Sequence, residues 1–206
     1  DGSLAAYPPA EIEATDLTSL ALELGLWGSG TLGFLTPPNP GALAEARRLL
    51  TALGALLDGR ITPHGQQLAA LPLHPRLGHM LLKSGANAQA VTLAALLAER
   101  DPVRGAPPDL ALRMAAIADP RKFEADHPYS VTRPVVDRIK AEAKRLDRAL
   151  RGEQAAHEKP LSLAQLAALA YPDRIGLRRK GDAPRWVLAG GTGAAMAPGL
   201  PLSDAR

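Results

Sequence analysis

Leucine and alanine recur at helical spacing through most of this sequence, and proline or glycine interrupts the pattern at short intervals. The first such segment follows Thr15 or Asp16, either of which is a suitable N-cap. One side of its helix would be formed by Leu17, Leu20, Ala21, Leu24 and Trp27. Aromatic residues make up only 3% of the chain, so the core must be built from aliphatic side chains. Short helices packed on one another suit this supply, and the sequence predicts a mainly α protein.

The first 75 residues predict two helices followed by a hairpin. We expect the helices over 16–27 and 42–54. The Asp58-Gly59 pair predicts a tight turn between two short strands, and Thr62 followed by Pro63 predicts the start of another helix. A small winged helix is built in this order. Helix 42–54 would occupy the place of a recognition helix.

From Pro75 onward the helical spacing continues almost without a break. The predicted helices span residues 76–84, 88–100, 109–118, 134–150 and 162–170. The longest has an apolar stripe formed by Val135, Val136, Ile139, Ala143, Leu146 and Leu150. Ser162 is the expected N-cap of the last helix, and residues 185–189 then predict a strand that turns into a second strand. We therefore expect a winged-helix unit over 1–75 packed on a helical bundle over 76–160, with a further domain and its short β-hairpin beginning over 161–206.

Composition limits the chemistry of the chain. It has no cysteine, which excludes disulfides and thiolate metal sites. No apolar run approaches the roughly 18 residues of a membrane-spanning helix, and the first residues lack the order of a signal peptide, so we expect a cytoplasmic protein with no membrane partner. The chain begins without Met, and we expect it to be part of a longer protein.

Positive charge is concentrated in the C-terminal part of the sequence. The 206 residues contain 24 Lys and Arg against 21 Asp and Glu, a net charge of +3. Residues 1–75 hold three of these cations and seven acids, a net −4, so residues 76–206 carry +7. Phosphate binding needs an excess of cations, so DNA binding by helix 42–54, with Glu45, Arg47 and Arg48, is disfavoured. Any nucleic-acid surface is expected in the C-terminal part.

Nucleotide-binding and metal-binding motifs find no support. Residues 28–33 match GxGxxG, but a helix precedes the glycines and FLTPPNP follows them, whereas a dinucleotide site needs a strand before and a helix after. A linker is the better interpretation. No GxxxxGK[ST] loop is present, so we expect no ATP binding by this chain. His74 and His79 are five residues apart, which is not the spacing of a zinc helix. Surface or capping roles are expected for the histidines, namely His64, His74, His79, His127 and His157.

Two basic stretches are candidates for binding nucleic acid. One is the long helix from Arg133 to Arg151, where Asp137, Glu142 and Asp147 also allow ordinary surface pairing. The other is the segment 174–185, in which nucleic acid or another partner is favoured over a solvated face. The candidate binding residues are Arg76, Arg100, Arg113, Arg138, Lys140, Lys144, Arg145, Arg148, Arg174, Arg178, Arg179 and Lys180. The low aromatic content disfavours a base-stacking platform of the kind found in single-strand-binding proteins.

The order of several short motifs resembles one known family. The run LLTALGALLDGRITPHGQQLAALPLHPRLGHMLLKSG, followed by LAALLAERDP, resembles the region after the motor domains of DEAH-box RNA helicases. The later segments LAALAYPDRIGLRR and RWVLAGGTGAAM resemble the bacterial HrpB-type branch. The resemblance covers nearly the whole chain.

The resemblance implies an accessory module without catalytic residues. In such helicases two RecA-like domains bind ATP and Mg and hydrolyse the nucleotide, while the winged helix and a helical "ratchet" bundle close over the RNA. Both motor domains are absent from this chain, so no cofactor and no enzymatic activity are expected of it. Single-stranded RNA and the motor domains of the parent are the implied partners. The alternative is a helical protein-interaction module whose cations only confer solubility.

Overall fold

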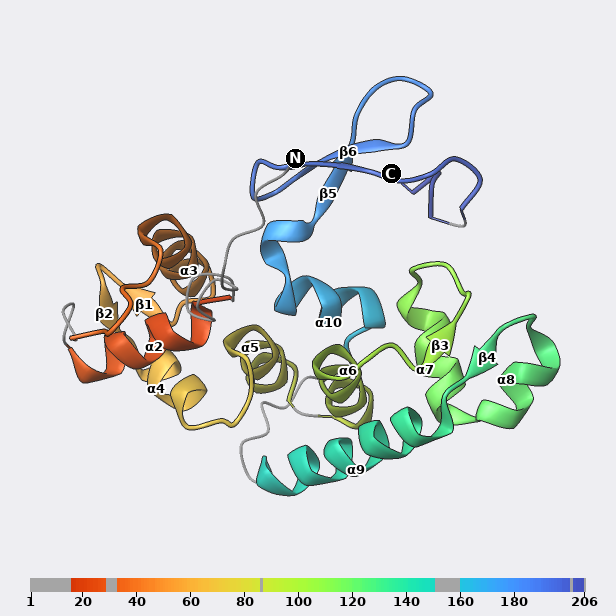
Figure 1. Ribbon diagram of the computed structural model, residues 1–206, viewed down its shortest axis with the longest axis horizontal. Coiled ribbons are helices and arrows are strands. Elements are labelled where there is room, and N and C mark those ends of the chain that lie inside the picture. Colours follow the sequence, from red (N-terminus) through yellow and green to blue (C-terminus); the bar gives the residue numbers. More distant parts are fainter. Residues whose placement is uncertain (1–15, 29–32, 86, 151–159, 201, 206) are drawn as a thin grey trace, which may run out of the picture. The chain divides into compact units, whose positions relative to one another are not determined.

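The computed structural model confirms the mainly α fold (Figure 1). It describes residues 16–28, 33–85, 87–150, 160–200 and 202–205. The chain divides into two compact units, Asp1–Gly78 and His79–Arg206, which are described separately below. Helix α5 (Pro75–Ser84) runs across this division.

The first unit has the predicted order of helices and hairpin. Its elements are α2 (Thr18–Trp27), α3 (Pro40–Ala52), β1 (Leu56–Leu57), β2 (Arg60–Ile61) and α4 (Pro63–Ala69). Helix α2 packs against α3 and α4, and the two strands pair antiparallel with Leu56 opposite Ile61. The core between these elements consists of aliphatic side chains, among them the fully buried Leu50 and Leu68. This arrangement is the winged helix expected from the sequence.

The hairpin and the helix after it are held by specific local geometry. Asp58 and Gly59 both have positive φ, 49° and 77°, which is the conformation of a two-residue type I′ turn. Thr62 caps α4 because its Oγ1 accepts a hydrogen bond from the Gly65 amide at 3.0 Å. A Cβ on Gly65 would lie 2.2 Å from the carbonyl oxygen of Ala55, so only glycine allows this close approach.

Two expectations for the first helix are wrong. Its N-cap is Leu17, not Thr15 or Asp16; Thr15 lies outside the described residues. Asp16 nevertheless contributes at this end, because its Oδ1 accepts a hydrogen bond from the amide of Thr18 at 2.8 Å. Trp27 does not point inward but is 66% exposed. It is the last helical residue before Gly28, whose left-handed φ of 69° ends the helix.

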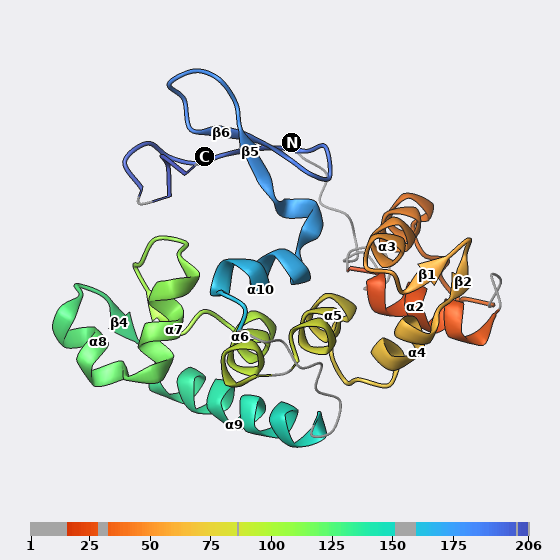
Figure 2. The ribbon, with the colours of Figure 1, turned by 180° about the vertical axis from the view of Figure 1, so that it is seen from behind.

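The second unit is built around two helices that pack along each other. Its helices, beyond α5, are α6 (Ala88–Ala98), α7 (Leu110–Ala118), α8 (Pro120–Asp126), α9 (Arg133–Ala149) and α10 (Leu163–Ala170). Helix α9 lies against α6 in both views, with α7 also in contact with both (Figures 1 and 2). All six residues of the predicted apolar stripe are buried in α9 and its C-cap. Ser162 caps α10 as predicted, with Gln165 completing a capping box.

The sheets of this unit are only partly predictable from the sequence. Strands β3 (Val103–Arg104) and β4 (Ser130–Val131) pair antiparallel although 25 residues, 105–129, separate them in the sequence. Strands β5 (Gly176–Arg178), β6 (Arg185–Leu188) and β7 (Gly193–Ala195) form one antiparallel sheet with β6 in the centre. The β6–β7 hairpin matches the expectation, whereas β3, β4, β5 and the short helix α8 were not expected. Strands of two or three residues are too short to show a period.

Candidate nucleic-acid interface

Half of the basic residues on helix α9 are paired with carboxylates. The shortest nitrogen–oxygen distances are 2.5 Å for Arg133 and Glu124, 2.8 Å for Arg138 and Glu99, and 2.6 Å for Arg145 and Glu142. The hydrogen bond from Arg138 lowers the pKa of Glu99 to about 2, and Glu99 in turn raises the pKa of Arg138. Arg138 and Arg145, two of the predicted binding residues, therefore have acidic partners within the chain.

The remaining cations of this helix form a row. Lys140, Lys144 and Arg148 follow one another at four-residue spacing, which places them along one side of α9. All three are exposed, and within the described residues none has a carboxylate at ion-pair distance. We call these three residues the α9 cation row. Like charges at this spacing destabilise a helix slightly, and the apolar stripe that buries α9 offsets that cost.

Arg113 lies inside the fold. Its side chain is 10% exposed, and its guanidinium donates two hydrogen bonds to Asp101 and further ones to the carbonyl oxygens of Pro107 and Asp109. Burial alone raises the pKa of Asp101, but the hydrogen bonds from Arg113 and from the Val103 amide outweigh it and leave the pKa below its ordinary value. Arg113 therefore fastens the α6–α7 loop to α7 and is not part of an exposed surface.

The ERDP segment, residues 99–102, contains two paired acidic residues and an exposed arginine. Glu99 binds Arg138 on α9 and Asp101 binds Arg113 on α7, so the chain is fastened on both sides of Arg100. Arg100 is exposed between them. Arg104, exposed on β3, is a further surface cation that the sequence reasoning missed, because a two-residue strand gives no signal of which side chains face outward. Arg76, at the start of α5 in the first unit, is buried.

The basic residues of the segment 174–185 also differ in exposure and in their contacts within the chain. Arg178 is half-buried, donates to the carbonyl oxygen of Ser203 and lies with its guanidinium carbon 5.6 Å from the centre of the Trp186 ring. It thus holds the C-terminal segment against the sheet. Arg174 lies over the Tyr171 ring at 4.8 Å. Arg179 and Lys180 are exposed, and no carboxylate of the described chain lies within ion-pair distance of either.

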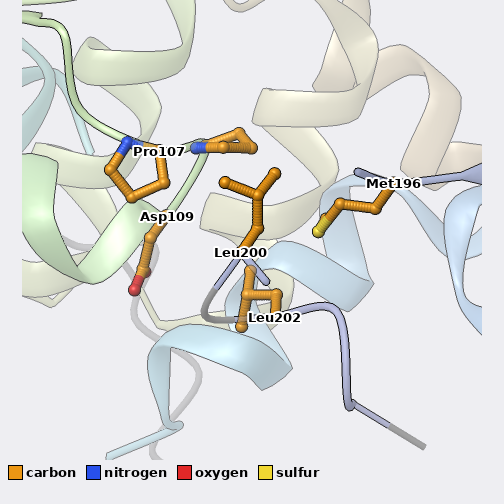
Figure 3. A pocket seen from close by; sticks show the side chains of 6 residues that line it. Pro107, Asp109, Met196, Leu200 and Leu202 are labelled. Carbon is orange, nitrogen blue, oxygen red and sulfur yellow. The ribbon is translucent and has the colours of Figure 1, made fainter. Parts of the chain in front are cut away.

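A small apolar hollow lies where the C-terminal segment meets the loop before α7. Figure 3 shows Leu200 and Leu202 beside Pro107 and Asp109, with Met196 also lining the hollow. The hollow has almost no space that a water molecule could occupy, so it is a packing contact and not a ligand site.

One of the histidines considered for a metal site, His74, contacts other residues of the fold. His74 Nδ1 accepts a hydrogen bond from the Arg76 amide at 3.2 Å, and its Nε2 lies 3.3 Å from Asp16 Oδ2. Three or more His, Asp or Glu side chains do not gather into a metal-binding group anywhere in the described residues. Part of the GxGxxG match and His157 lie outside those residues. Among the described helices, none has the length and hydropathy to cross a bilayer.

Part of the winged helix matches the model of a known protein family. Residues 46–73, from the middle of α3 through the hairpin and α4 to four residues beyond that helix, match the family model of the helicase-associated domain (HA2), winged-helix. The fold and the match define this unit as a helicase-associated domain.

The similarity extends over nearly the whole chain in one relative. The chain is 32% identical over 195 residues to the ATP-dependent RNA helicase HrpB of Escherichia coli, covering 93% of this chain and 22% of that protein. A crystal structure of the E. coli DExH-box NTPase HrpB superimposes with a TM-score of 0.70 at 31% identity, over 98% of this chain and 23% of that one. The Arabidopsis helicase DExH1 is 41% identical over 47% of this chain and 11% of its own length.

These matches confirm the resemblance read from the sequence. The chain is a helicase-associated segment, winged helix and ratchet region, of the HrpB-type DEAH-box RNA helicases. It spans about a fifth of the length of its HrpB relative.

Proposed function

We propose that this segment is a non-catalytic accessory part of an ATP-dependent RNA helicase and grips single-stranded RNA through contacts to phosphates. Its relatives are named as ATP-dependent RNA helicases. In the proposed parent, motor domains outside this chain bind ATP and Mg, and this segment closes over the strand. Contacts to phosphates carry no sequence information, so the strand can move through the grip as the motor changes shape.

The observation that carries the proposal is the α9 cation row. On the same helix, Arg133, Arg138 and Arg145 are already paired with carboxylates of the chain. Within the described residues, Lys140, Lys144 and Arg148 have no carboxylate at ion-pair distance, and their helix packs against α6. A rigid row of unopposed cations suits a polyanion. Arg100, Arg174, Arg179 and Lys180 are the other proposed phosphate contacts, because they are exposed as well.

The test is the salt dependence of RNA binding. Changing Lys140, Lys144 and Arg148 together to Ala should flatten the log–log salt slope by up to roughly 2, since each phosphate contact on a single strand contributes about 0.7. Affinity should fall by a similar factor for RNAs of different sequence. Binding is measured by fluorescence anisotropy at low salt, where surface charges are least screened.

The first unit provides a matched control. Arg47, Arg48 and Arg60 are also exposed, so their joint replacement by Ala removes the same charge from the less basic unit. This control should leave the slope nearly unchanged. An unchanged slope in the α9 variant, with its helical content intact, would contradict the proposal. The alternative, a protein-interaction module, would then be favoured. The exposed Ile175 and Leu177, near and on β5, support that alternative.

A further inference from the structure

One face of the β5–β6–β7 sheet is apolar and open to solvent. The strand register places Leu177 of β5 opposite Val187 of β6. Ile175 lies two residues before Leu177, so its side chain is on the same face, because side chains alternate along a strand. Ile175 and Leu177 are 53% and 70% exposed, and Val187 is half-buried. We call this side of the sheet the open sheet face.

The opposite face of the sheet is already covered. Arg178 and Trp186 are paired in the register and lie on that opposite face. Arg178 donates a hydrogen bond to the carbonyl oxygen of Ser203, and Trp186 Nε1 donates one to the carbonyl oxygen of Ala205 at 3.2 Å. The C-terminal segment therefore packs on one side of the sheet and leaves Ile175 and Leu177 uncovered on the other.

Two arginines lie at one end of the open sheet face. The Arg179 amide donates a hydrogen bond to the carbonyl oxygen of Arg185 at 2.8 Å, which continues the register and places both side chains on this face. Both are exposed, and neither has a carboxylate of the described residues at ion-pair distance. Like charges directly opposite each other on a sheet repel. A carboxylate bound between the two guanidinium groups would offset that repulsion.

The dimensions of the open sheet face fit one helix. Its three strands, about 4.8 Å apart, make a surface roughly 10 Å wide, which is about the diameter of one α-helix. From Ile175 to Arg179 the strand is roughly 16 Å long at about 3.3 Å per residue, so the face covers roughly 200 Å². A stable dimer buries about 800 Å² on each copy. The face is thus too small to hold a second copy of this chain by itself.

We propose that the open sheet face docks one amphipathic α-helix of a protein partner, with apolar side chains on Ile175 and Leu177 and acidic side chains between Arg179 and Arg185. A helix packed on an apolar sheet face is a stable layer arrangement. This inference goes beyond the proposed RNA grip and uses a surface other than the α9 cation row. Arg179 is also a proposed phosphate contact, so Arg185 is the cation that the tests change.

The first experiment uses three synthetic helical peptides that carry a fluorophore. The acidic peptide has leucines at i, i+3, i+4 and i+7 and glutamates at one end of this stripe. A scrambled peptide has the same composition without the stripe, and a basic peptide has lysines in place of the glutamates. Fluorescence anisotropy at low salt should show the tightest binding for the acidic peptide. Equal binding of the scrambled peptide, or no binding of the acidic one, overturns the proposal.

The second experiment tests the apolar centre of the open sheet face. Leu177→Thr keeps a high strand propensity but removes most of the apolar side chain, so it should weaken binding of the acidic peptide about 10-fold. Leu57→Thr is the matched control, because Leu57 is 65% exposed on β1 of the first unit. It should leave the affinity unchanged. An equal effect of the two changes, or no effect of Leu177→Thr, overturns the proposal.

The third experiment exchanges charge between the chain and the peptide. Arg185→Glu should weaken binding of the acidic peptide about 5-fold and strengthen binding of the basic peptide by a similar factor. Arg104→Glu makes the same change of charge on β3, where Arg104 is also exposed, and should alter neither affinity as strongly. A loss for the acidic peptide without a gain for the basic one overturns the carboxylate contact.

Two other occupants would give different results. Sedimentation equilibrium that shows a dimer of the unaltered chain, dissociated by Leu177→Thr, overturns the proposal in favour of a second copy. Single-stranded RNA that displaces the acidic peptide, and whose own binding is weakened by Leu177→Thr, overturns it in favour of nucleic acid. Failure of the peptide to bind leaves salt-dependent RNA binding through the α9 cation row standing, so the two proposals fail separately.

Discussion

Leu96 and Leu97 are adjacent in helix α6, but their side chains differ in exposure to solvent. From the sequence we expect Leu71, Leu81, Leu96 and Leu97 to be buried core residues. Leu81 and Leu96 are buried, at 0% and 5% exposed, but Leu71 and Leu97 are only half-buried. Consecutive residues on a helix point about 100° apart, so Leu96 and Leu97 cannot both face the same neighbour.

Leu96→Ala should therefore destabilise the chain more than Leu97→Ala. Removing the buried side chain leaves a cavity and should cost about 2–5 kcal/mol of unfolding free energy. Leu97→Ala is the matched control, since its side chain is already partly in water. Urea denaturation followed by circular dichroism measures both. A change within about 0.5 kcal/mol for Leu96→Ala, the range of ordinary surface substitutions, would show that this side chain is not part of the core.

At the scale of elements, ion pairs connect helices that the apolar core already brings together. Helices α6 and α9 pack along each other, and Glu99 at the C-terminal end of α6 pairs with Arg138 on α9. The oxygen and nitrogen are 2.8 Å apart, although neither side chain is fully buried. Such a pair adds little stability by itself, but it responds to pH.

The contribution of this pair should disappear in acid. The pKa of Glu99 is about 2 in the folded chain against an ordinary value of 4.5, because Arg138 stabilises the carboxylate. A lowered folded pKa means that the stabilisation is fully present above about pH 4.5 and is lost as the pH falls toward 2.

Glu99→Gln tests this by comparison. The difference in unfolding free energy between the unaltered chain and the variant should shrink between about pH 4.5 and pH 2. Glu45→Gln on α3 is the control, because Glu45 is exposed and no cation of the described residues pairs with it. A difference that stays constant over this range would contradict the assigned pair.

At the scale of the whole molecule, charge is unevenly distributed, and the sequence has no phosphate-binding loop motif. The net charge of +7 over residues 76–206 belongs almost entirely to the second unit, and the first unit carries the winged helix. Neither contains a GxxxxGK[ST] loop, and the chain spans about a fifth of its HrpB relative.

The purified chain should therefore show no ATP hydrolysis, with or without RNA. Phosphoryl transfer needs a loop that cradles the phosphates and carboxylates that hold Mg, and this sequence supplies no such loop. A coupled phosphate-release assay measures it, with a preparation of the Lys140, Lys144 and Arg148 to Ala variant as a control for contaminants. RNA-stimulated hydrolysis that is lost in that variant would contradict this expectation.

Local sequence patterns predicted most of the helices, and the order of short motifs predicted the family. Periodicity placed the buried stripe of α9, the Asp58-Gly59 pair predicted the turn, and Ser162 predicted a cap, because each depends on residues within a few positions. The tertiary structure alone decided which cations are available. Arg113 and Arg178 look like Lys140 and Lys144 in a sequence, yet their partners Asp101 and Ser203 are 12 and 25 residues away. Pairing across such separations depends on how the elements pack, and no local pattern encodes it.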